Sequence, residues 1–130
     1  MKSTAVILTG LVLVTATACG TNLSSPSSHA AEQFYRALAA GDGAAACELL
    51  APQTREEVED SAEAPCRTAI LDEDIPAAGA VTGLHQYGDQ AQVRLSGDTA
   101  FLAEFGNGWK VVAAACTPRG ERPYDCKVEG

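Results

Sequence analysis

The chain has 130 residues, of which 46% are hydrophobic and 20% are charged, so its composition is that of one folded domain rather than a disordered segment. Nine basic and 17 acidic residues give a net charge of −8. Nucleic-acid binding requires clusters of Lys and Arg that neutralise phosphates, and the sequence contains none. The composition therefore argues against nucleic acid as a partner and against adhesion to anionic lipids by charge alone.

Residues 1–18 are predicted to be a cleaved signal peptide. Lys2 supplies the basic start, and the apolar stretch 5–14 has signal-peptide length, shorter than the roughly 20 residues that span a bilayer. Removal of this leader takes away Lys2, which leaves eight basic and 17 acidic residues and a net charge of −9.

Cys19 is the predicted lipidation site. Small residues followed directly by Cys resemble the lipobox of bacterial lipoproteins, in which the cysteine sulfur receives a diacylglyceryl group, with palmitate as an acyl chain. Ala16 stands where the lipobox usually has Leu, and Ala16 with Ala18 also fits general signal peptidase, so a secreted protein is the alternative. Acylation leaves an even number of cysteines, which suits an oxidising compartment. Residues 19–29 are then a lipidated Cys and a flexible tether that hold the protein on the extracytoplasmic face of the cell membrane.

Residues 30–130 are predicted to form a single α+β domain, in which short N-terminal helices pack on a curved antiparallel sheet. The helices are expected to start at about Ala30, at Gly43 behind the cap Asp42, at a capping box formed by Thr54 and Glu57, and at Pro65. Alternating hydrophobicity predicts a four-stranded meander, and the tail after Cys116 reads as loop with at most a short strand around 125–128. The four strands are expected at 80–87, 90–96, 99–105 and 109–116.

Four cysteines of this domain permit three pairings, and the spacing alone does not choose among them. Proximity along the chain favours Cys47 with Cys66 and Cys116 with Cys126, each bridge being worth about 3 kcal/mol on the loop-entropy model. The sequence has no CxxC pair and no histidine near these cysteines, which argues against zinc and against dithiol catalysis. We therefore predict structural disulfides, no metal and no cofactor.

Candidate catalytic residues are few. His85, the only histidine of the predicted domain, could use Asp89 as a carboxylate partner, but we interpret it as a half-exposed strand histidine. Tyr35, Tyr87 and Tyr124 could donate to a bound ligand, and no serine lies in a nucleophile elbow. A dense acidic run is interpreted as a solvated helical face, with weak divalent-ion or basic-partner binding as the alternative. This run comprises Glu56, Glu57, Glu59, Asp60 and Glu63, followed by 72–74.

Several stretches of the domain are similar to a group of small, largely uncharacterised actinobacterial lipoproteins. They are Phe34 to Leu38, Gly41 to Leu50, Gly97 to Leu102, Gly108 to Val111, Cys116 to Pro118 and Pro123 to Cys126.

Those lipoproteins in turn resemble the nuclear transport factor 2-like superfamily of cystatin-like α+β cones, in which helices fill one mouth of a curved sheet. Some members are isomerases or cyclases with an Asp or His acid–base pair, and many are non-catalytic. No inward-facing Asp with a Tyr partner can be placed in this sequence. The resemblance therefore implies the fold and the location but no activity.

The sequence thus favours a non-enzymatic, lipid-anchored envelope protein that binds a ligand or a protein partner through the concave face of its sheet. One alternative is a small pocket enzyme of isomerase or hydratase type, with His85 acting together with Asp89 or a tyrosine. Another is an accessory subunit of a membrane complex.

Overall fold

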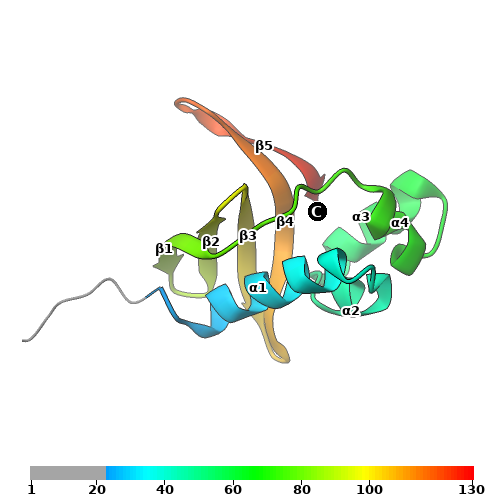
Figure 1. Cartoon of the computed structure of the whole chain (residues 1–130), viewed down its shortest axis with the longest axis horizontal. Coiled ribbons are helices and arrows are strands. Elements are labelled where there is room, and N and C mark those ends of the chain that lie inside the picture. The colour runs from blue at the N-terminus through cyan, green and yellow to red at the C-terminus, as the bar shows by residue number, and fades with distance from the viewer. Residues whose placement is uncertain (1–22) are drawn as a thin grey trace, which may run out of the picture.

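The computed structural model describes residues 23–130, so the predicted signal peptide and Cys19 lie outside the described residues (Figure 1). Four helices precede five strands, which confirms the predicted α+β class and element order. Within residues 23–130, no helix is long and apolar enough to cross a bilayer. The elements are α1 (Pro26–Ala39), α2 (Gly43–Glu48), α3 (Pro52–Ala62), α4 (Cys66–Asp72), β1 (Val81–Tyr87), β2 (Gln90–Leu95), β3 (Asp98–Phe105), β4 (Gly108–Arg119) and β5 (Arg122–Glu129).

The strands form one antiparallel sheet in the order β1-β2-β3-β4-β5. The prediction of four strands is wrong by one, because the tail forms the complete strand β5 and pairs with β4 as far as Arg119 and Arg122. Gly120 and Pro123 made this segment look like a loop. Gly120 instead adopts the left-handed conformation of the hairpin turn, with φ 67°, and proline is tolerated on an edge strand.

Helix α1 begins at Pro26, four residues before the predicted start, so it includes the last part of the predicted tether. Ser25 and Ser28 form a reciprocal capping box, and Pro26 occupies the first turn, where its missing N–H costs nothing. Ser27 is buried, and its Oγ donates to Oε1 of Gln86 in β1 over 3.0 Å. The start of α1 is therefore fixed against the first strand.

Helices α2 and α4 lie against each other and are joined by the Cys47–Cys66 disulfide, with a Cα–Cα distance of 6.1 Å. Asp42 caps α2 as predicted, since its Oδ1 accepts from the backbone N–H of Ala45 over 3.0 Å. Gly43 is required by the close approach of the two helices, because an added Cβ would lie 1.8 Å from the carbonyl oxygen of Arg67.

Helix α3 begins at Pro52 and not at the predicted capping box. Thr54 is buried, and its hydroxyl donates over 3.0 Å to the carbonyl oxygen of Val112 in β4. The segment just before α3 adds a short parallel bridge to the same strand: Ala51 N–H donates to Val111 O over 2.8 Å, and Val111 N–H donates to Leu49 O over 2.7 Å. Thr54 therefore bonds to the sheet instead of capping its own helix.

The hydrophobic core fills the space between α1 and one face of the sheet. Helix α1 crosses this face, while α2, α3 and α4 lie beside the part of the sheet that contains β4 and β5 (Figure 1). The largest fully buried apolar side chains are Phe34 of α1, Ile70 of α4, Val93 of β2, Leu102 of β3 and Val111 of β4. The opposite face, which we call the outer face, carries no helix among the described residues.

Replacing Cys116 and Cys126 together by alanine is expected to lower the free energy of unfolding by about 2.5 kcal/mol, because the bridge closes a short loop. The two cysteines are 10 residues apart, whereas Cys47 and Cys66 are 19 apart. The matched Cys47/Cys66 double alanine variant should therefore lose slightly more, about 3 kcal/mol. Urea denaturation of both variants checks this order, and a clearly larger loss for Cys116/Cys126 would contradict the loop-entropy explanation.

Candidate functional site

The candidate site lies on the outer face of the sheet. Side chains alternate between the two faces of a strand, and Ala91 and Val93 of β2 are buried against the helices, so Gln92 points outward. The pairing register places His85 of β1 and Phe101 of β3 directly across from Gln92. These three side chains form a row across the middle of the outer face.

A groove of about 490 Å³ follows this row. Its polar side is formed by His85 and Gln92, and its apolar floor by Phe101, Ala103 and Val112. An apolar surface with a few polar groups that fix orientation is typical of small-ligand sites. The sequence predicts binding on a concave face, but the core fills the helix side of the sheet, and the groove lies on the opposite side.

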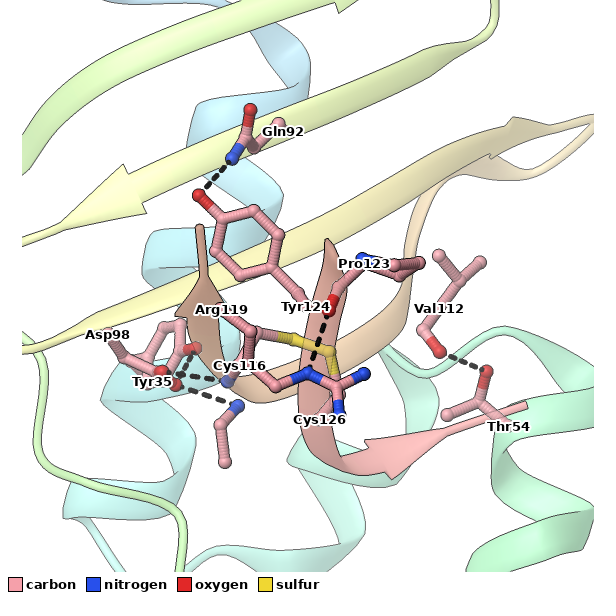
Figure 2. The surroundings of a disulfide bond; sticks show 11 residues. Tyr35, Thr54, Gln92, Asp98, Val112, Cys116, Arg119, Pro123, Tyr124 and Cys126 are labelled. Carbon is pink, nitrogen blue, oxygen red and sulfur yellow. Dashed lines mark hydrogen bonds between the residues drawn. A yellow bond between two sulfur atoms is a disulfide. The ribbon is translucent and has the colours of Figure 1, made fainter. Parts of the chain in front are cut away.

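The last part of β4 and the first part of β5 form a two-stranded arm, residues 115–126, which is not paired with β3. The Cys116–Cys126 disulfide bridges the two strands of this arm. The arm carries Tyr124 onto the outer face (Figure 2). The Tyr124 hydroxyl accepts from Nε2 of Gln92 over 3.0 Å, and its ring meets Phe101 edge-on, with centroids 5.2 Å apart. Of the three predicted tyrosines, Tyr124 is therefore the one that hydrogen-bonds to the central row.

The other predicted tyrosines have separate places. Tyr87 lines the groove and is 77% exposed, whereas Tyr35 lies in the core. His85 is exposed and lines the groove, but no hydrogen bond or ion pair joins it to Asp89 in the part of the chain that the structure describes. The proposed acid–base partners are thus close in sequence without being paired in the fold.

No inward-facing Asp with a Tyr partner is expected from the sequence, and the structure contains an Asp–Tyr pair formed by Asp98 and Tyr35. The hydroxyl of Tyr35 in α1 donates to Oδ2 of Asp98, at the start of β3 (Figure 2). The same carboxylate accepts from the backbone N–H of Ala115 over 2.9 Å and of Cys116 over 3.2 Å. The residues that meet here are 63 and 17 positions apart along the chain, so no local pattern in the sequence reveals the cluster.

The Tyr35–Asp98 pair has a structural role. Burial raises the pKa of Tyr35 far above its usual value, and the hydrogen bond to Asp98 and its negative charge raise it further. Tyr35 therefore stays neutral and acts as a donor. Ala115 has the left-handed φ of 54°, which is unfavourable for a residue with a Cβ. The carboxylate of Asp98 accepts hydrogen bonds from the backbone N–H groups of Ala115 and Cys116 at this bend, where β4 is no longer paired with β3.

The acidic run remains a solvated surface in the structure. Glu56, Glu57 and Asp60 are exposed, and Glu59 accepts from Nε of Arg55 over 3.1 Å in an i,i+4 ion pair. Within residues 23–130, no group of three or more His, Cys, Asp or Glu side chains is placed to hold a metal ion.

No protein-family model matches the chain, and neither a curated protein nor a solved structure matches it. The resemblance to lipoproteins and to the cone superfamily stays a prediction, and function has to be argued from the geometry of the site.

Asp98→Ala is expected to lower the free energy of unfolding by about 3 kcal/mol or more, because it leaves one hydroxyl and two N–H groups without their charged acceptor. Tyr35→Phe removes one of these bonds and should cost about 1.5–3 kcal/mol. Urea denaturation checks both values. Asp89→Ala, in an exposed turn, is the matched control and should change the stability by no more than about 0.5 kcal/mol; an equal loss for Asp89→Ala and Asp98→Ala would refute the assigned role.

Proposed function

We propose that this protein is a lipid-anchored, non-enzymatic component of the cell envelope that binds a ligand or a partner protein through the groove on its outer face. The observation that carries the proposal is the groove itself, which combines the apolar floor of Phe101, Ala103 and Val112 with the polar groups of His85 and Gln92. Such a surface supplies buried area together with a few oriented hydrogen bonds.

The distribution of acid–base groups supports binding over catalysis. His85 lies on the outer face, while Asp98 lies beneath the arm, where Tyr35 and two backbone N–H groups already occupy its oxygens. A general base needs a free acceptor within hydrogen-bond reach of the proton it removes. The carboxylate of Asp98 is thus committed to the fold.

The proposed anchor is a diacylglyceryl group on Cys19. Its support is the small-residue sequence before Cys19, the predicted resemblance to actinobacterial lipoproteins and the two disulfides, which are typical of an oxidising compartment. A net charge of −9 after removal of the leader makes a covalent lipid a better means of membrane attachment than surface electrostatics.

Cys19→Ser in the full-length chain is expected to abolish incorporation of an alkyne-labelled palmitate and to move the protein from the membrane fraction to the medium, because the acceptor sulfur is gone. Thr21→Ser is the matched control and should keep both the label and the membrane location. Membrane retention and labelling of Cys19→Ser at the level of the control would contradict the proposed anchor.

Ala103→Arg is expected to remove the molecules that copurify with the protein from detergent-solubilised membranes, because the long cation would fill the apolar floor of the groove. Placing an unpaired charge against apolar surface costs on the order of several kcal/mol, enough for at least a tenfold loss of affinity. Ala39→Arg, at an exposed position of α1, is the matched control. Quantitative mass spectrometry of the copurified fraction measures the outcome, and equal recovery from the two variants would contradict binding in the groove.

The second candidate is an isomerase or hydratase, which is favoured by His85 lying in the groove beside Tyr87. Copurification also separates these two functions. If the protein is an enzyme and His85 is its base, the His85→Ala variant would retain the unconverted substrate, which differs in mass or structure from the compound that the wild type retains. A binding protein would retain the same compound as the wild type.

A further inference from the structure

We infer that Tyr87 and Phe105 form an aromatic rim that contacts the bilayer surface when the protein is anchored through Cys19. This inference rests on the anchor proposed above. It adds a second point of attachment and a fixed orientation of the domain on the membrane.

The two rim residues lie at the same end of the sheet. Tyr87 ends β1 beside the turn to β2, and Phe105 ends β3 beside the turn to β4. The backbone N–H of Glu104 donates over 2.8 Å to the carbonyl oxygen of Asp89, so the turn between β1 and β2 contacts the end of β3.

Both rim side chains point to the outer face. Tyr87 pairs with Gln90, Gln90 pairs with Ala103, and Phe105 follows Ala103 by two positions along β3. Directly paired residues, and residues two apart in a strand, share a face. Tyr87 and Phe105 thus border the same surface that carries the groove.

Their exposure is unusual for this domain. Among the described residues, three large hydrophobic side chains are exposed: Tyr87 at 77%, Leu71 at 44% and Phe105 at 38%. Two of the three therefore lie at one sheet end, and the third lies on α4. Tyrosine has an apolar ring and a polar tip, a combination that is enriched in the head-group region of membranes.

The chain leading to Cys19 leaves the domain at this same end. Ser27 donates to Gln86, the neighbour of Tyr87, and Ser25 caps the helix just before it. Cys19 and Ser25 are six positions apart in the sequence, and an extended chain covers at most about 20 Å over that length. The start of α1 and strand β1 lie at one end of the molecule, and α4 lies at the other (Figure 1). A lipid on Cys19 therefore brings the rim, and not α4, to the membrane.

The charged side chains beside the rim determine which kind of lipid surface the rim can contact. Asp89 and Glu104 are exposed beside the rim, whereas Lys110, the nearby cation, is half-buried and donates from Nζ to the carbonyl oxygen of Glu48 over 2.8 Å. An acidic border is repelled by anionic head groups but not by zwitterionic ones. The rim thus fits a zwitterionic bilayer surface, and Tyr87, which also lines the groove, places one end of the groove next to the lipid.

Photolabelling of the full-length acylated protein tests this orientation. The protein is reconstituted on phosphatidylcholine vesicles that contain a trace of a phospholipid with a diazirine in its head-group region, and labelled side chains are mapped by mass spectrometry. We expect several-fold more label on Tyr87 and Phe105 than on Leu71, which is the control because it is also a large exposed apolar side chain, close to Phe105 in exposure, but is distant from the anchor. Replacing part of the phosphatidylcholine by anionic phosphatidylglycerol should reduce the labelling of the rim.

The possible failures are distinguishable. Acylated, vesicle-bound protein with equal label on Leu71, or with no label on Tyr87 and Phe105, would overturn the rim and leave the anchor intact. Protein recovered without the lipid and free of the vesicles would overturn both the anchor and the inference that rests on it.

Discussion

The carboxylate of Asp98 holds strand β4 at the bend where β4 separates from β3. Strands β3 and β4 are paired only as far as Phe101 and Ala113, so the backbone N–H groups of β4 beyond Ala113 have no strand partner in β3. Asp98, the first residue of β3, accepts from two of these groups, Ala115 and Cys116. Hydrogen bonds to a charged acceptor are worth about 1.5–3 kcal/mol each, which offsets the left-handed conformation that Ala115 adopts at the bend.

The third donor to this carboxylate joins the bend to the core. Tyr35 comes from α1, and its ring packs edge-on against Phe34, with centroids 5.3 Å apart. One side chain therefore connects the helical layer, the sheet and the arm. The arm in turn brings Tyr124 to Gln92 and Phe101, so the shape of the outer face depends on a contact made on the other side of the sheet.

Local patterns in the sequence predicted much of this fold, because alternation and turn residues report directly on neighbouring positions. The first four strands, the cap at Asp42 and both disulfides agree with expectation. Thr54 was misassigned because a capping box competes with a bond to a distant strand, and the sheet prevails. Strand β5 was missed because Pro123 is compatible with an edge strand as well as with a loop.

The candidate site was harder to predict because its residues meet through pairing register and not through spacing. His85 and Asp89 are close in sequence but unpaired, whereas Tyr35 and Asp98 are 63 residues apart and bonded. Strand alternation alone could have placed Gln92 and Phe101 on one face, and it would have pointed to the groove. The arm that carries Tyr124 above them depends on the bend at Ala115, for which no residue nearby in the sequence gives a signal.

Native-state amide hydrogen exchange of the wild type and of Asp98→Ala measures whether Asp98 holds the bend of β4. The amide of Val111, which donates to Leu49 O, provides the internal reference. We expect the substitution to speed exchange at Ala115 and Cys116 far more than at Val111, because these two amides lose their acceptor while the sheet beside Val111 stays intact. If Asp98→Ala changes the protection of the Ala115 and Cys116 amides no more than that of the Val111 amide, Asp98 does not hold the bend.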